Sequence, residues 1–229
     1  MKSIRSTALL SLVLALGACE GGSRGSGITT VQGNVESVEA AFRDSPRRRS
    51  EFAWLTRLLA AEGTADADGA LEGIRVSVEG SSIADDTDVN GFFSLRGHFE
   101  GDVAIRFERP IDEASARMAV NVPAAGMLTL NNVTIDGRNG EATAESADVA
   151  FDGLVASADC SAETLGLVSS EGSSTETDVY VVDLDTSSLH DAKGTPVACE
   201  ELTVGEAARL AGSVNADGTF GNADIEVEP

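Results

Sequence analysis

Few side chains in this sequence are suited to catalysis. Its two histidines, His98 and His190, could each act as a general base, but a histidine in a polar turn is more often a surface residue. The sequence contains no HExxH zinc motif, and no serine stands in a GxSxG elbow between an expected strand and an expected helix. Carboxylates are abundant throughout the sequence, so two of them close together are no evidence of a catalytic pair. We therefore expect a protein that is not an enzyme.

One acidic stretch matches the start of a calcium-binding loop. Residues 86–91 (DTDVNG) follow the pattern D-x-D-x-N-G. A calcium loop also needs a bidentate glutamate at its twelfth position, which is Gly97 here, and residues 92–95 have the pattern of a strand. An acidic hairpin turn is therefore the favoured interpretation. Weak calcium binding stays open as the alternative, and its ligands would be Asp85, Asp86, Asp88 and Asn90.

The beginning of the chain has the features of an export signal. Lys2 and Arg5 precede an apolar stretch, residues 8–16, that is too short to span a bilayer. Residues 16–19 (LGAC) then resemble the lipobox of bacterial lipoproteins. The resemblance implies a signal peptide over 1–18, a covalent lipid such as palmitate on Cys19, and membrane attachment through that lipid. It places the protein in the bacterial cell envelope, facing the periplasm or the cell exterior. An ordinary secreted protein with a free Cys19 is the alternative.

Two further cysteines follow far along the chain. In an oxidising compartment, Cys160 and Cys199 are an even pair within one expected domain, which predicts a disulfide. Two separate buried thiols are the alternative. A redox-active pair is disfavoured because the sequence has no C-x-x-C spacing.

A cluster of three arginines lies beside aromatic and apolar residues. Residues 47–49 (RRR) stand at the start of an expected helix, where cations oppose the helix dipole. Anionic lipid would attract them. Pairing with the acidic surface of the protein itself, while Phe52 and Leu55 cover a sheet edge, is the favoured interpretation.

Composition and charge exclude two classes of protein. The net charge of -22 argues against nucleic-acid binding, and a hydrophobic content of 42% argues against wholesale disorder. Acidic residues are concentrated late in the chain: residues 139–229 hold two basic and 19 acidic residues, whereas residues 19–138 hold 12 and 19. This shift predicts two domains that meet near residues 138–147.

The hydropathy pattern predicts a mainly β protein. Residues 19–27 form a flexible Gly- and Ser-rich tether, and a helix is expected at about 45–62, with Ser45 as its N-cap and Pro46 in its first turn. Asn-Gly and Asp-Gly pairs at 90–91, 136–137, 139–140 and 217–218 suit two-residue hairpins. Alternating hydropathy predicts strands at 28–35, 74–79, 92–96, 103–108, 117–122, 127–135, 142–151, 164–169, 178–184, 208–214 and 222–227.

Three segments of the first half resemble the carboxypeptidase regulatory-like family. They are residues 74–80 (IRVSVEG), 87–95 (TDVNGFFSL) and 101–107 (GDVAIRF). The resemblance implies a small transthyretin-like β-sandwich over 28–140, with the helical stretch as an insertion. It implies no catalytic residue.

The second half is similar to small OB-like β-barrel domains of unknown function in bacterial envelope proteins. The similarity rests on residues 151–155 (FDGLV), 179–184 (VYVVDL), 210–214 (LAGSV) and 223–227 (ADIEV), and it implies an acidic barrel with a disulfide over 141–229. OB folds often bind oligonucleotides or sugars. Nucleic acid is disfavoured here because the acidic surface would repel phosphates.

The function expected from these features is a non-catalytic binding, scaffold or assembly module. It would be held at a membrane by the lipid, and its partners would be envelope proteins or glycans. The alternatives are a glycan-binding module and, less favoured, a hydrolase with an unrecognised site. No cofactor is expected apart from the lipid, and weak calcium binding at the acidic turn stays open as the alternative given above.

Overall fold

The computed structural model of the 229-residue chain describes residues 27–39, 71–110, 114–171 and 178–228. These residues form thirteen β-strands, which confirms the prediction of a mainly β protein. No helix within these ranges is long and apolar enough to cross a bilayer. The predicted signal peptide, Cys19, nearly all of the tether and the predicted helix at about 45–62 lie outside the described residues.

The first half of the chain folds into two facing sheets, which we call the sandwich. One sheet has the order β4–β1–β7–β8 and the other has the order β3–β2–β5–β6. All pairs within them are antiparallel except β1–β7, which is parallel. The bounds are β1 (Thr29–Glu39), β2 (Arg75–Val78), β3 (Ala84–Asp86), β4 (Phe92–Gly97), β5 (Gly101–Arg109), β6 (Ala114–Val122), β7 (Met127–Asp136) and β8 (Glu141–Asp159).

The core of the sandwich is built from alternate residues of these strands, as expected when one face of a sheet is buried. Phe93 of β4 and Phe107 of β5 come from the two different sheets, and both are fully buried. Their rings meet edge to face, with centroids 5.7 Å apart. A Cβ atom on Gly33 of β1 would stand 3.1 Å from the Phe93 ring and 2.5 Å from the main-chain oxygen of Leu130. The glycine therefore permits the close approach of ring and strand.

The second half of the chain closes into a ring of strands, which we call the barrel. Its order is β8–β9–β10–β13–β12 and back to β8, with β10 and β13 parallel at one contact. A further strand, β11, continues along the edge of β13 beyond β10. The bounds are β9 (Thr164–Ser169), β10 (Tyr180–Asp183), β11 (Ser188–Asp191), the 3-10 helix η2 (Cys199–Glu201), β12 (Ala207–Val214) and β13 (Phe220–Glu228).

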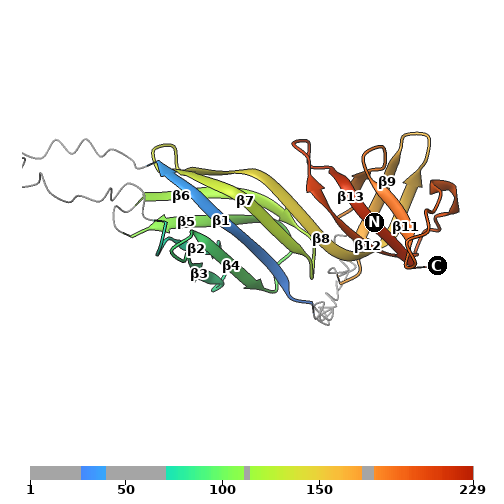
Figure 1. The fold of residues 1–229 in the computed structure, drawn as a ribbon. Coiled ribbons are helices and arrows are strands. Elements are labelled where there is room, and N and C mark those ends of the chain that lie inside the picture. The colour runs from blue at the N-terminus through green and yellow to red at the C-terminus, as the bar shows by residue number, and fades with distance from the viewer. Residues whose placement is uncertain (1–26, 40–70, 111–113, 172–177, 229) are drawn as a thin grey trace, which may run out of the picture.

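A single long strand, β8, belongs to both units. Residues 141–150 pair with β7 in the sandwich, residues 148–154 pair with β12, and residues 153–159 pair with β9. In Figure 1 this strand runs from the sandwich at the left into the barrel at the right. Residues 138–147, where two domains were expected to meet, therefore lie at the sandwich end of this strand, and the pairing changes to the barrel strands from residue 148 onward, with no linker between the units.

The turns differ in detail from the predicted two-residue hairpins. Gly91 has the positive φ of 77° that a turn requires, but β3 pairs with β2 and β4 pairs with β1, so the Asn90-Gly91 turn joins the two sheets. The pairs at 136–137 and 139–140 act together in one longer β7–β8 loop, in which Asp136 pairs with Glu141. The hairpin prediction is wrong for Asn90-Gly91 because tertiary pairing, and not turn sequence, selected the partners of β3 and β4. The predicted loop length is wrong for the β7–β8 turn and also for the turn at 217–218, where Val214 pairs with Phe220.

Candidate binding groove

A groove of about 920 Å³ opens between the sandwich and the barrel. The sandwich contributes β6, β7 and the first part of β8, and the barrel contributes β10 and the β12–β13 hairpin. The sandwich side is mainly apolar, and its side chains include Met118, Val120, Leu130, Ala142, Ala144 and Ala147. A concave, largely apolar surface with polar groups at its rim is typical of a ligand site.

Two strand edges border the groove. The strands β6 and β8 meet at a single parallel bridge, Arg117 with Glu141, where the amide of Arg117 donates to the oxygen of Gly140 at 3.0 Å. Beyond this bridge, within the described part of the chain, residues 118–122 pair only with β5, and residues 142–144, 146 and 147 pair only with β7. The side of each strand that faces away from these partners therefore carries main-chain groups with no neighbouring strand.

The barrel end of the groove is formed by an aromatic cluster. Tyr180 stacks on Phe220 with ring centroids 5.6 Å apart and an angle of 13° between the planes, and Phe151 packs against both rings. Burial raises the pKa of the Tyr180 hydroxyl, and the nearby carboxylates of Asp178 and Glu100 raise it further. The hydroxyl therefore stays neutral at physiological pH.

Exposed valines extend the apolar lining onto the barrel. Val179 and Val181 stand two residues apart at β10 and keep 52% and 40% of their surface exposed. Both side chains line the groove. The residue that follows them, Val182, is fully buried in the barrel. Exposed apolar side chains clustered at a concavity indicate an interaction surface more strongly than the same residues scattered singly.

The rim of the groove is acidic. Its described lining has three carboxylates, on Glu141, Asp178 and Asp217, and one cation, Arg117. The Nε atom of Arg117 lies 2.7 Å from the carboxylate of Glu79, so its charge is already partly compensated. The electrostatic field at the rim therefore favours a cationic ligand.

The turn between β6 and β7 connects the two units beside the groove. The hydroxyl of Ser169 in β9 donates to the oxygen of Ala124 at 2.7 Å, and the amide of Ala125 donates to the hydroxyl of Thr29 at 3.0 Å. A Cβ atom on Gly126 would stand 3.1 Å from that of Phe151 in the barrel. Contacts through this turn and the continuous strand β8 together fix how the walls of the groove face each other.

The predicted calcium ligands have separate partners in the structure. Asp88 accepts the amides of Asn90 and Phe92 at 2.8 and 2.9 Å, and these bonds lower the pKa of its carboxyl. Asp85 accepts the amide of Ser94 at 2.7 Å, and Asp86 lies 3.8 Å from Arg75. In the described ranges no three His, Cys, Asp or Glu side chains are grouped as a metal site would require. Weak calcium binding at this turn stays an untested prediction.

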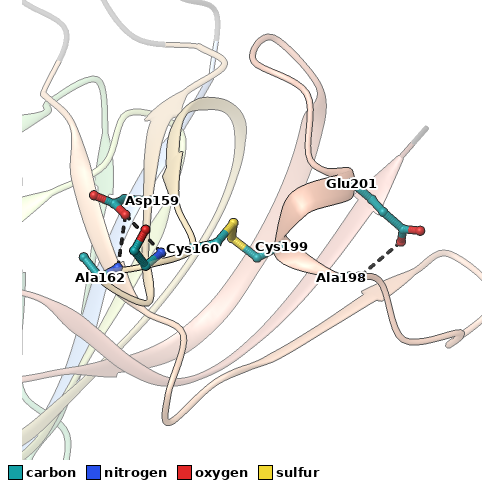
Figure 2. Close-up of a disulfide and its surroundings, with 7 residues drawn as sticks. Asp159, Cys160, Ala162, Ala198, Cys199 and Glu201 are labelled. Atoms are coloured by element: carbon teal, nitrogen blue, oxygen red, sulfur yellow. Dashed lines mark hydrogen bonds between the residues drawn. A yellow bond between two sulfur atoms is a disulfide. The ribbon is translucent and has the colours of Figure 1, made fainter.

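The predicted disulfide is present in the barrel. Cys160 lies in the β8–β9 turn and Cys199 begins η2, with their Cα atoms 5.7 Å apart (Figure 2). Asp159 accepts the amides of Ser161 and Ala162, which fixes the first turn, and the Glu201 carboxylate accepts the amide of Ala198, which fixes the start of η2. The disulfide thus links the β8–β9 turn to the start of η2, although its two cysteines are 39 residues apart in the sequence.

The two histidines lie apart from the groove. The Nδ1 atom of His98 is 3.0 Å from the oxygen of Gly27. In β11, the Nδ1 and Nε2 atoms of His190 face the oxygen of Asp191 at 2.9 Å and the carboxylate of Asp224 at 2.7 Å. Both partners are acceptors, and only the protonated imidazolium can donate to both. The hydrogen bond to Asp191 and then the one to Asp224 therefore raise the pKa of His190.

This arrangement makes one contribution to stability depend on pH. Because the folded state raises the pKa of His190, the protonated side chain stabilises the fold below its ordinary pKa of about 6.5, and this contribution is lost as the pH rises through the folded-state value. Replacing His190 with glutamine should therefore destabilise the protein more at pH 5 than at pH 8.5. Urea unfolding of both proteins at the two pH values measures the difference.

The partner of the histidine supplies a second test of the same assignment. In the Asp224→Asn protein, the pKa of His190 should move down towards its ordinary value, which an NMR titration of the ring protons records. An unchanged titration curve would show that Asp224 has no part in holding the proton.

The remaining predicted sites lie in the undescribed parts of the chain. These are the lipidation site Cys19 and the arginine cluster at 47–49. Comparison of the chain with models of known families, with curated proteins and with solved structures found no match.

The groove itself was not among the sites predicted from sequence. Its lining consists largely of Ala, Val, Leu and Thr, which carry no chemical motif. The sequence signals nearest to it are the small residues at 142, 144 and 147 and the apolar run at 179–182, and each of these by itself predicts only a strand.

Proposed function

We propose that this protein is a non-catalytic binding module of the bacterial cell envelope, anchored by a lipid on Cys19, and that its ligand site is the groove between the sandwich and the barrel. The observation that carries the proposal is the groove: an apolar wall, an acidic rim and two strand edges brought together by both units. The apolar lining and the open strand edges offer surface for recognition.

The finer fold assignment is part of this proposal. Two four-stranded sheets that face each other support a transthyretin-like sandwich, and the ring order β8–β9–β10–β13–β12 supports an OB-like barrel of five strands. In the proposed arrangement each unit supplies one wall of the groove. Neither unit alone would form the site.

The glycan-binding alternative has less support. Sugar rings stack on exposed aromatic faces, whereas Tyr180 and Phe220, the aromatic residues of the groove, are 9% and 4% exposed and stack on each other. In the described ranges the one large aromatic side chain with substantial exposure is Phe92, which lies on β4 away from the groove. A protein ligand therefore fits the groove better than a glycan.

The anchor makes a separate prediction. Replacing Cys19 with serine should release the protein from the membrane fraction, because a thioether-linked diacyl group cannot form on a hydroxyl and the attached lipid provides the membrane affinity. Fractionation of cells that express either protein, followed by immunoblotting, measures the distribution. Recovery of the variant in an unchanged membrane fraction would contradict lipid anchoring.

The groove is tested in the cells that make the protein. A photoreactive amino acid placed at Val179, which lines the groove and is 52% exposed, should crosslink a partner protein, whereas the same residue at Leu154, which is 37% exposed on β8 but outside the groove, should not. Mass spectrometry of the adduct identifies the partner. Equal labelling from both positions would argue against the groove as the binding site.

A further inference from the structure

Three features of the groove together specify the form of its ligand. The edges of β6 and β8 leave the Arg117–Glu141 bridge in the same direction, because the bridge is parallel. The next residues of each strand have a sheet partner on one side only, within the described strands. Main-chain groups along such edges pair readily with an added strand.

The side chains at these edges leave space for an added strand. After Glu141 at the rim, the residues of β8 that line the groove are alanines and a threonine, at 142, 143, 144 and 147, and none of these is large. Met118 and Val120 of β6 and the exposed Val179 and Val181 of β10 provide apolar contact. Side chains of an extended chain alternate between two faces, so every second residue of an added strand would meet this apolar wall.

The charge of the groove rim determines which side chains fit on the other face of an added strand. Carboxylates at Glu141, Asp178 and Asp217 border the groove, and Glu100 and Asp102 lie close enough to Tyr180 to raise its pKa. The whole chain carries a net charge of -22. An acidic ligand would be repelled, and lysine or arginine at alternate positions would meet the rim.

We propose that the groove binds an extended, basic segment of a partner protein, in which apolar residues alternate with lysine or arginine, as an added β-strand between β6 and β8. This inference rests on the proposed function, since it names the ligand class for the same site. The apolar residues of the segment contact Met118 and Val120, its cations contact the rim, and its main chain pairs with the open strand edges.

The direct test uses peptides of defined pattern and the complete mature chain carrying Cys19→Ser. An eight-residue peptide of alternating valine and lysine should bind, as measured by isothermal titration calorimetry. An alternating valine and glutamate peptide should not bind. A peptide with the charge of the first but N-methylated at its valines should bind at least about tenfold more weakly, because it cannot donate main-chain hydrogen bonds along one edge.

Matched variants locate the binding site on the protein. Replacing Ala144 with tryptophan should fill the groove and abolish binding, and the double replacement Glu141→Lys and Asp178→Lys should weaken binding about tenfold or more. Glu200→Lys changes an exposed carboxylate in η2, outside the groove lining, and should leave binding nearly unchanged. Thermal unfolding of each variant verifies that it is folded.

Each contrary result has a definite meaning. Equal binding of the N-methylated and unmodified peptides would overturn strand addition and show attraction by charge alone. Binding that survives Ala144→Trp in a folded protein would place the peptide elsewhere. Dimerisation on concentration that Ala144→Trp abolishes, measured by sedimentation, would assign the groove to a second copy of this chain and overturn the proposal.

The outcome also separates this inference from the proposed function. If no basic peptide binds but the photoreactive residue at Val179 still crosslinks a partner, the groove is the binding site and its ligand is not a basic strand. If neither occurs, the inference and the proposed function both fail.

Discussion

Replacing Phe93 with alanine should lower the free energy of unfolding by about 3–5 kcal/mol, which is the usual effect of removing a fully buried phenylalanine. Phe93 is completely buried, and its ring meets that of Phe107 from the opposite sheet. The shorter side chain would remove this contact and leave a cavity between the two sheets. Urea unfolding followed by circular dichroism measures the change.

The preceding residue provides the matched control. Phe92 occupies the same strand, but its side chain points to the other face and is 46% exposed. Phe92→Ala should therefore cost less than about 1 kcal/mol. Similar losses from the two replacements would mean that the alternation of β4 differs from that of the structure.

Removing the disulfide should destabilise the protein by about 4 kcal/mol, because the bond restricts a loop of about 40 residues in the unfolded chain. The double replacement Cys160→Ser and Cys199→Ser, made in the Cys19→Ser background, eliminates the bond that links the β8–β9 turn to η2. Urea unfolding compares it with the parent protein. The loss should appear chiefly as early unfolding of the barrel.

A reducing agent supplies the control for this experiment. Dithiothreitol should destabilise the parent to a similar extent and should have no effect on the double variant, which has no bond to reduce. Equal stability of the parent with and without the reductant, at full reduction of its thiols, would show that the crosslink contributes nothing.

The sequence predicted strands well where buried and exposed residues alternate along a single stretch. The strand at 164–169 has its predicted bounds, and residues 92–96 and 127–135 differ from β4 and β7 by one residue at one end. Such strands can be predicted locally, because the alternation of apolar and polar residues along one stretch already shows which face is buried. The same applies to the disulfide, which follows from an even pair of cysteines in one expected domain.

The strands that sequence analysis missed are short and polar. β3 has the sequence ADD and β11 the sequence SLHD, and neither has the apolar alternation that marks a strand. Each forms because a neighbour supplies the hydrogen-bonding edge: β2 for β3 and β13 for β11. Strand formation of this kind depends on tertiary pairing more than on intrinsic preference.

The length of the longest strand also depends on tertiary pairing that the sequence does not show. Residues 142–151 were predicted as one strand, but β8 continues to Asp159. Residues 152–159 include Gly153, which breaks the apolar alternation and reads as a strand end. In the fold Gly153 is paired on both sides, with Ser169 and Ala208, and a Cβ atom there would stand 2.6 Å from the oxygen of Val168. The groove depends on this continuity, so it could not be seen in the sequence.

The shared strand also determines how the molecule would bear mechanical load. Interstrand hydrogen bonds of an antiparallel pair lie perpendicular to the strands. A pull on the barrel along the axis of β8 would therefore shear all the bonds that hold residues 141–150 to β7 at once, without opening them one after another. Tension between the barrel and the sandwich is thus spread over a whole ladder of hydrogen bonds.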